Sequence, residues 1–307
     1  MNLPRLIAFL LAALLLLSLS ACAGTPEQSA AEASDPPAPS PASEPEPTPD
    51  PTPEPTPAPT PEPAPDPTPA PTPTPTPEPT PDLSPLPDSW FDDAVIFGDS
   101  VSTALEKQCL KTGDLGDVTF FVIISYSAHN AVSGQLKIWI DSRDYFPEEV
   151  SAMLEARKVF FMMGLNDIAL YGGVDKTMTY WETLLDRFAE TSPGTTLFIE
   201  SCLPICWYGE LEDWNNDIVD EYNRRLQALC EERGCVYVDL AHYFKDEGNG
   251  MRMDLCWDAR CHPNYEGAAI WIEQLRNPLN YSVDPRSIDY EGRWANALAG
   301  TETEVLP

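Results

Sequence analysis

Three short motifs carry side chains that together could perform acyl transfer. The first, Gly-Asp-Ser, ends at Ser100; the second, Gly-Leu-Asn-Asp, contains Asn166; the third runs from Asp258 to His262. An imidazole can deprotonate a serine hydroxyl, a carboxylate can orient that imidazole, and an amide can donate to a developing oxyanion. The motifs therefore predict a nucleophile, a general base with its orienting acid, and an oxyanion donor.

Each of these side chains also has a purely structural interpretation. Asp-Ser is a common pair at a helix N-terminus, and a loop imidazole is often only a partly buried surface group. We expect Asp99 and Asp167 to brace their turns. His129 and His242 are interpreted as ordinary loop residues, although His129 lies close enough to the motifs to line a pocket.

The elements that must position the motifs follow from the hydrophobic pattern. Short apolar runs bounded by Gly, Asp or Ser predict buried strands over 94–97, 118–124, 159–163, 196–199 and 236–238. Amphipathic segments predict helices over 101–110, 148–156, 177–190, 216–232 and 265–276. This alternation predicts a parallel sheet with helices on both faces, a three-layer α/β/α domain. Active sites in such sheets form outside the carboxyl ends of the strands, where the motifs stand.

In this order the motifs resemble those of the SGNH, or GDSL-type, hydrolase family, from about residue 91 to residue 276. The resemblance implies a flavodoxin-like parallel sheet and ester hydrolysis through an acyl-enzyme. We expect no cofactor and no metal. It implies that Ser100 is the nucleophile, His262 the general base and then acid, and Asp258 its orienting carboxylate. Asn166 and the backbone N–H of Ser100 would form the oxyanion hole.

Two departures from the family pattern matter. The family usually spaces its last pair Asp-x-x-His, but Ala259 holds that position here. The loop must bulge for Asp258 to reach the imidazole; otherwise a backbone carbonyl or Asp254 orients His262, or a Ser–His dyad suffices. The family also offers a glycine N–H after the second strand, where this chain reads residues 125–130 as Ser-Tyr-Ser-Ala-His-Asn. Another N–H of that turn would complete the oxyanion hole.

The first 88 residues predict an export signal and a spacer. A short apolar run ends in Leu-Ser-Ala-Cys at Cys22, which resembles the lipobox of bacterial lipoproteins, and an ordinary secretory signal is the alternative. Of the 34 prolines, 26 lie between Pro26 and Pro87, so a disordered, extended Pro-rich linker is expected. The predicted organisation is a signal peptide over 1–21, a spacer over 22–88, the hydrolase domain over 89–277, and a loosely packed tail over 278–307.

Charge excludes several partners. Residues 89–307 hold 37 acidic and 17 basic residues, a formal charge of −20. Nucleic-acid binding needs clustered Lys and Arg, and so does adhesion to anionic lipid. We therefore expect no nucleic-acid partner, and membrane association only through a lipid anchor on Cys22 at the outer face of the cell membrane. A monomer is a separate expectation.

The remaining cysteines and aromatic residues suggest supporting roles. An oxidising location favours three local disulfides, Cys202–Cys206, Cys230–Cys235 and Cys256–Cys261, with Cys109 left over. Zinc is disfavoured because no Cys-x-x-Cys pair exists. Four aromatic residues are candidate walls of a substrate cleft, with core or lid packing as the alternative: Trp207, Tyr208, Trp214 and Trp257.

These observations predict a surface-tethered serine esterase whose substrate is a small acylated molecule or a polysaccharide. Aromatic residues near the rim and an extracellular location favour O-deacetylation of carbohydrate. The alternatives are an O-acetyltransferase or a lysophospholipase-like lipase of the same fold, and a non-catalytic glycan-binding lipoprotein.

Overall fold

The five predicted buried strands form one parallel sheet in the computed structural model, which describes residues 82–302. The sheet has the order β2-β1-β5-β6-β7, with every neighbouring pair parallel. Four of its strands, β1, β5, β6 and β7, are buried along their whole length, whereas the edge strand β2 is mostly half-buried, contrary to the prediction. The bounds of its strands are β1 Ala94–Gly98, β2 Thr119–Val122, β5 Lys158–Met162, β6 Thr196–Glu200 and β7 Val236–Val238.

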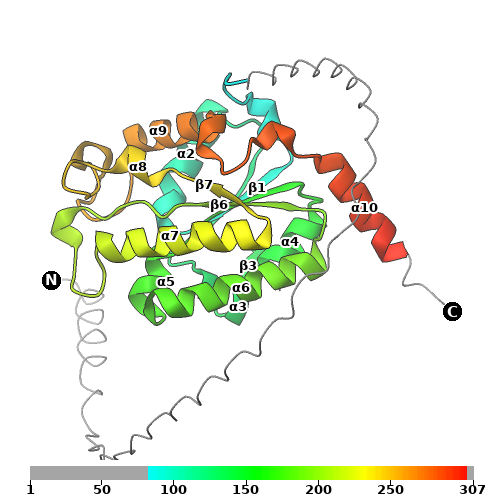
Figure 1. Cartoon of the computed structure of the whole chain (residues 1–307), viewed down its shortest axis with the longest axis horizontal. Helices are drawn as coiled ribbons and strands as arrows, with labels where there is room; N and C mark the ends of the chain where they lie inside the picture. Colours follow the sequence, from blue (N-terminus) through cyan, green and yellow to red (C-terminus); the bar gives the residue numbers. More distant parts are fainter. Residues whose placement is uncertain (1–81, 303–307) are drawn as a thin grey trace, which may run out of the picture. The chain divides into compact units, whose positions relative to one another are not determined.

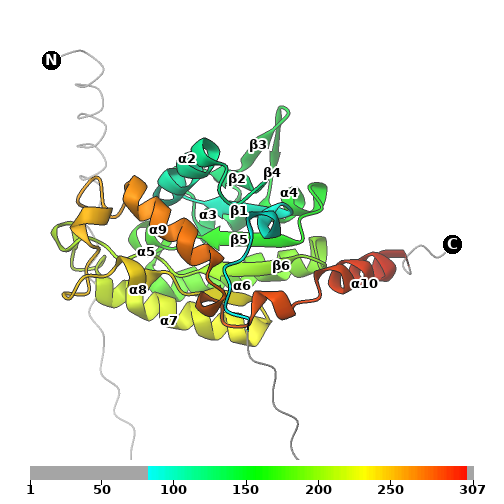
Figure 2. The same cartoon turned by 90° about the horizontal axis from the view of Figure 1, so that it is seen from above.

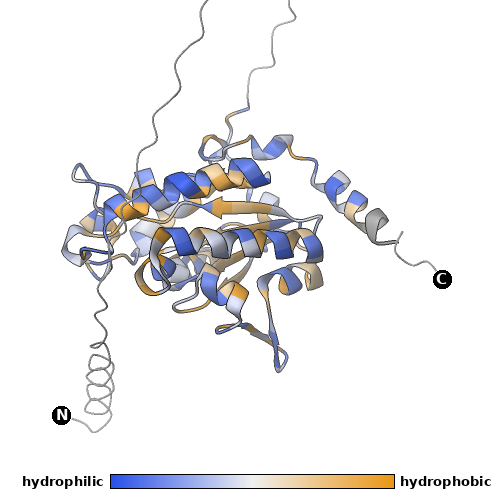
Figure 3. Cartoon of the chain, turned by 60° about the horizontal axis from the view of Figure 1, so that its bottom comes forward, coloured by the Kyte–Doolittle hydropathy of each residue, from blue (hydrophilic) through white to orange (hydrophobic). Residues whose placement is uncertain are grey.

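Helices cover both faces of the sheet, as the three-layer prediction requires (Figures 1 and 2). Helices α2 (Thr103–Thr112) and α9 (Tyr265–Arg276) pack together on one face. The other face carries α3 (Ala128–Ser133), α4 (Pro147–Met153), α6 (Gly173–Thr191) and α7 (Asn216–Arg233). Apolar residues gather on the strands, and the outer faces of the helices are polar (Figure 3). Burial of the strand residues therefore stabilises the layered arrangement.

Several shorter elements do not appear in the sequence prediction. Strands β3 (Ile138–Ile140) and β4 (Arg143–Tyr145) form a two-stranded hairpin that projects from the domain (Figure 2). Helix α5 (Leu165–Leu170) follows β5, and α8 (Ala241–Phe244) follows β7. No helix in the described part of the chain has both the length and the apolar character needed to cross a bilayer.

The sequence predicts a loosely packed tail over 278–307, and for the segment around Tyr281 this prediction is wrong; residues 303–307 lie outside the described residues. Tyr281 is buried, its hydroxyl donates to the Leu275 carbonyl at 2.6 Å, and the Ser282 N–H donates to the Tyr237 carbonyl. Helix α10 (Tyr290–Glu302) follows. Aromatic side chains with partners distant in sequence hold the tail on the domain, and such contacts leave no periodic pattern in the sequence.

The strand order determines where a site can form. Strands β1 and β5 are neighbours at the centre of the sheet. The chain continues from β1 to β2 on one side of this pair, and from β5 to β6 on the opposite side. A crevice opens at the carboxyl ends of two neighbouring strands whose connections run in opposite directions. Ser100 follows β1 and Asn166 follows β5, so both stand at this crevice. The signal peptide, Cys22 and almost all of the spacer lie outside the described residues.

Candidate active site

Ser100 begins a short 3-10 turn, Ser100–Ser102, directly after β1. Asp99 caps this turn: its side chain is buried and its Oδ1 accepts the Val101 N–H at 2.8 Å. Burial raises the pKa of Asp99 to about 7, partly opposed by the hydrogen bond from Val101. Ser100 itself is half-buried, and its backbone N–H has no hydrogen-bond partner among the described residues.

Three side chains form a continuous chain of hydrogen bonds, and we call them the triad. His262 Nε2 lies 2.9 Å from Ser100 Oγ, and His262 Nδ1 lies 2.6 Å from Asp258 Oδ2. Ser100 and His262 are 162 positions apart in the sequence. The fold therefore places a hydroxyl, an imidazole and a carboxylate in the order required for nucleophilic catalysis.

The bulge needed to bring Asp258 to the imidazole is present. Ala259 has a φ of 56°, in the left-handed region that non-glycine residues rarely adopt. The loop closes because Asp258 Oδ1 accepts three backbone N–H groups, from Arg260 (2.9 Å), Cys261 (3.2 Å) and His262 (3.3 Å). The other predicted candidate, Asp254, instead pairs with Arg252 at 2.7 Å.

Asp258 stays ionised because donors surround it. Burial by itself would raise its pKa, but hydrogen bonds from His262, the Arg260 N–H and the Cys256 thiol outweigh burial and lower the pKa to about 2. The thiol contact, Cys256 Sγ to Asp258 Oδ1, measures 3.2 Å. A carboxylate that is ionised at neutral pH can hold the imidazole in one tautomer and stabilise its protonated form.

Asn166 lies beside the triad at the start of α5. Its Nδ2 donates to Asp99 Oδ2 at 2.7 Å and to the Tyr126 carbonyl at 3.2 Å. The preceding turn requires glycine: Gly164 has a φ of 142°, and a Cβ there would lie 2.6 Å from Cys202 Sγ. Both amide hydrogens thus have partners at rest, and the longer bond, to Tyr126, is the one that an oxyanion could replace.

Ser125 brings a further N–H to the same place. It follows β2, has a φ of 62°, and lines a hollow together with Ser100 and Asn166. Its N–H has no hydrogen-bond partner among residues 82–302. Sequence reasoning predicts a donor in this turn without identifying it, because a left-handed serine has no sequence signature.

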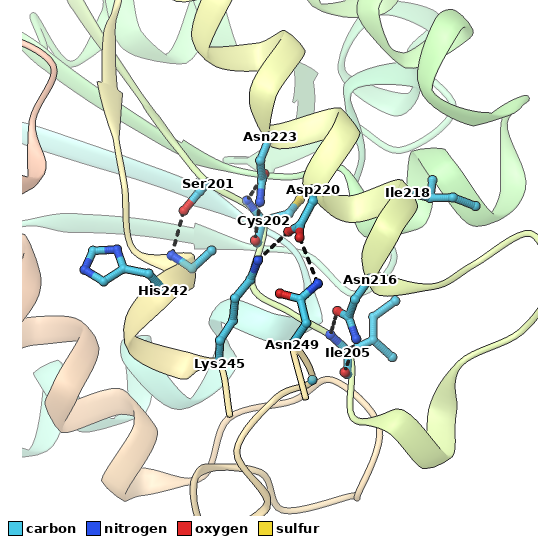
Figure 4. A network of polar contacts seen from close by, with 12 residues as sticks. Ser201, Cys202, Ile205, Asn216, Ile218, Asp220, Asn223, His242, Lys245 and Asn249 are labelled. Atoms are coloured by element: carbon cyan, nitrogen blue, oxygen red, sulfur yellow. Dashed lines mark hydrogen bonds and ion pairs between the residues drawn. The ribbon is translucent and has the colours of Figure 1, made fainter. Parts of the chain in front are cut away.

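A second layer of contacts holds the loop of the triad. The side chains of α7 clamp the segment after β6: Asn223 exchanges two hydrogen bonds with the Cys202 backbone, and Asn216 exchanges two with that of Ile205 (Figure 4). The next N–H, of Cys206, donates to the Arg260 carbonyl at 2.7 Å. The rigid helix α7 is thereby connected to the bulge beside Asp258.

The three predicted disulfides are absent, because all seven cysteines in the described residues are free. The thiols have other neighbours. Cys202 Sγ donates to the Met163 carbonyl at 3.1 Å, Cys256 Sγ faces Asp258, and Cys261 Sγ lies 3.7 Å from His262 Nδ1. Cys230 is buried on α7, and Cys235 lies beyond the end of that helix.

Other predicted residues take varied places. Asp167 braces the start of α3 by accepting the N–H groups of Ala128 (2.9 Å) and His129 (2.8 Å). His129 stacks on Tyr171 with ring centroids 4.0 Å apart, and His242 lies on α8 beside Asp239. Trp257 and Trp214 each line a hollow next to Ser100, whereas Trp207 and Tyr208 stack on each other and line neither.

Comparison with known proteins places this geometry in context. A model of the GDSL-like lipase/acylhydrolase family matches residues 97–270. Similar solved structures include a GDSL-like lipase from Bacteroides thetaiotaomicron (14% identity, 60% of this chain and 86% of that chain, TM-score 0.47). Others are a carbohydrate esterase of family 3 from Talaromyces cellulolyticus (14%, 59% and 93%, 0.42) and a catalytic mutant of an acetylxylan esterase from Geobacillus stearothermophilus (17%, 59% and 91%, 0.43). No curated protein matches the chain.

Proposed function

The chain belongs to the GDSL-like lipase/acylhydrolase family and is an SGNH-type hydrolase acting on ester bonds; from this premise we propose that it is a cell-surface serine esterase that removes O-acetyl groups from carbohydrate. The observation that carries the proposal is the unbroken path from Ser100 Oγ through His262 to Asp258, at distances of 2.9 and 2.6 Å.

The proposed reaction assigns one role to each group. Ser100 Oγ attacks the acyl carbon while its proton passes to His262 Nε2, and Asp258 stabilises the imidazolium. The negative oxygen accepts hydrogen bonds from the N–H groups of Ser100 and Ser125 and from Asn166 Nδ2, which releases the Tyr126 carbonyl. His262 then protonates the departing alcohol.

The acyl-enzyme is cleaved by the same groups in reverse. His262 removes a proton from water, the resulting hydroxide attacks the acyl carbon, and Ser100 leaves with the proton returned by the imidazolium. The net change is ester and water to alcohol and carboxylic acid. A sugar hydroxyl in place of water would make the protein an acetyltransferase.

Two features support carbohydrate as the substrate and the cell surface as the location. Trp257 is 70% exposed yet lines a hollow beside Ser100, so a flat aromatic face is available to the substrate. The lipobox-like sequence at Cys22 and the Pro-rich spacer support tethering outside the membrane.

The decisive experiment has two steps. A fluorophosphonate probe should label the wild type and fail to label Ser100→Ala, since only an activated serine reacts. Acetate release is then measured on a panel of acetylated glycans, with a lysophospholipid as contrast. A folded wild type that resists the probe would favour a binding lipoprotein, and preference for the lysophospholipid would favour a lipase.

A further inference from the structure

Two separate hollows meet at Ser100 and His262, and their linings differ. The second, of about 420 Å³, contains Asn166 and Ser125, which are the proposed oxyanion donors. The first, of about 390 Å³, contains neither of them. The first hollow lies between α2, the turn after β2 and the triad loop with the start of α9, and its lining includes Thr103, Lys107, Ile124, Trp257 and Tyr265.

The apolar side chains of the first hollow are unusually accessible. Ile124 is 75% exposed, Trp257 70% and Tyr265 55%, and they come from three separate segments of the chain. Large apolar side chains that gather around one hollow on a solvent-exposed surface indicate a binding site. The size of the hollow lies within the range of ligand pockets and far exceeds what a methyl group needs.

The orientation in which the ester must react determines which part of it lies in the first hollow. The carbonyl oxygen must point towards Asn166, hence towards the second hollow. The departing alcohol must lie within reach of His262 Nε2, its proton donor. The first hollow is bounded by His262 itself and by Trp257, whose ring centroid is 6.0 Å from that of His262.

Resting on the proposed function, we propose that the first hollow is the subsite for the alcohol part of the ester, and that this part is a sugar ring lying flat against Trp257. The C–H face of a pyranose is apolar and matches an aromatic face, whereas its hydroxyls need polar partners at the edge. The acetyl group occupies only the space next to Ser100.

Helix α2 supplies those polar partners. Thr103 and Lys107 are four positions apart, so they lie on the same face of the helix. Lys107 has no carboxylate within 4.0 Å, and the Thr103 hydroxyl has no hydrogen-bond partner, among the described residues. Asn264, in contrast, already donates to the Asp254 carbonyl and accepts the Gly267 N–H. Thr103 and Lys107 are therefore free to bind sugar hydroxyls.

The test compares two exposed tryptophans in the full chain. Trp257→Ala should lower the ratio of kcat/KM for an acetylated xylo-oligosaccharide over that for vinyl acetate by about tenfold or more, mainly through KM. Trp139, 67% exposed on the β3–β4 hairpin, is the matched control, and Trp139→Ala should leave kcat/KM unchanged for both substrates. Equal losses for both esters in Trp257→Ala would overturn the subsite, since they would indicate only a disturbed His262.

A binding measurement separates the subsite from the proposed chemistry. Calorimetry with Ser100→Ala should show that the acetylated oligosaccharide binds about tenfold more weakly once Trp257→Ala is added. Unchanged affinity would overturn the subsite even if the wild type is an active esterase. A preference of the wild type for p-nitrophenyl octanoate over the acetate that disappears in Trp257→Ala would also overturn it, because the hollow would then hold the acyl part.

Discussion

The triad and the aromatic cluster around Trp90 both join segments that are far apart in the chain, but different forces hold them. We define the Trp90 cluster as Trp90, Phe91, Phe160, Phe198, Tyr281 and Tyr290. The centroid of the Trp90 ring lies 4.8 to 6.2 Å from the centroids of the other five rings, edge to face in every pair. The triad is held by two directional polar contacts, His262 to Ser100 and His262 to Asp258, between side chains on loops.

This difference separates reactivity from stability. The Trp90 cluster ties the segment before β1 to the sheet and to the tail, and the Lys158 ammonium lies over the Trp90 and Tyr290 rings at 4.9 and 4.7 Å while pairing with Asp93. Its contribution depends on buried area and ring packing. The His262 and Asp258 side chains of the triad remain 25% and 18% exposed, and the function of the triad depends on the direction of its hydrogen bonds. Changes in one region should therefore leave the property of the other nearly intact.

The largest expected effect comes from breaking the triad without changing its shape. Asp258→Asn removes the charge that orients His262 and stabilises the imidazolium, so kcat on p-nitrophenyl acetate should fall by about 10²- to 10⁴-fold. Asp254→Asn is the matched control, since its carboxylate pairs with Arg252. If Asp258→Asn hydrolyses the ester at the wild-type rate, a Ser–His dyad is sufficient for catalysis and the role proposed for Asp258 is wrong.

The next effect should appear in stability alone. Trp90→Ala leaves a cavity against Phe160, Phe198 and the tail, and should lower the free energy of unfolding by about 3 kcal/mol. Chemical denaturation followed by circular dichroism measures the loss, and kcat on the same ester should stay within about twofold. Tyr208→Ala, at an exposed ring outside the cluster, is the control. A drop in kcat of Trp90→Ala comparable to that of Asp258→Asn would contradict the independence of catalysis from the Trp90 cluster.

The sequence predicts the triad far better than the Trp90 cluster, for a physical reason. Ser100, Asn166 and His262 follow strands of one parallel sheet, and parallel strands bring their carboxyl ends to one edge, so placement on the rim follows from strand assignment alone. The resemblance of the motifs adds their order. Aromatic packing has no such rule: nothing in the spacing of Trp90 and Tyr290 indicates that their rings meet.

The details within the site are likewise beyond sequence reasoning. Whether Asp258 reaches His262 depends on Ala259 adopting a left-handed conformation, which three N–H groups on the carboxylate enforce. The cysteine pairing fails for a related reason. Cysteines close in sequence suggest disulfides, but the direction of each thiol depends on the loop, and the Cys256 thiol points to Asp258.

A buried carboxyl group outside the triad should make the stability of the fold depend on pH. Glu200, at the end of β6, is buried. Its Oε2 accepts the indole N–H of Trp271 at 2.7 Å, and its Oε1 has no partner among the described residues. Burial raises the pKa of Glu200 to about 8, partly opposed by that hydrogen bond. The folded state thus keeps a proton that the unfolded chain releases, so stability should fall as pH rises from about 4.5 to about 8.

Glu200→Gln removes this loss. The variant should be more stable than the wild type by about 2 kcal/mol at pH 9, less than the pKa change alone implies because the new amide N–H₂ also lacks a partner. Urea unfolding at pH 5 and pH 9 measures the difference, with Glu232→Gln on the surface of α7 as control. Equal stabilities of variant and wild type at pH 9 would contradict a buried, neutral Glu200.

The smallest effect concerns the Cys256 thiol, which donates to the carboxylate of the triad. Cys256→Ala removes a donor from Asp258 Oδ1 but leaves its three backbone N–H donors, so kcat should fall by only about three- to tenfold. Cys256→Ser restores a donor of similar size and should recover the rate. Cys230→Ala, at a buried thiol away from the triad, should cost stability without changing kcat. Because a thiol donates only weakly, a loss in Cys256→Ala that serine does not recover would mean that packing, and not the hydrogen bond, holds the carboxylate in place.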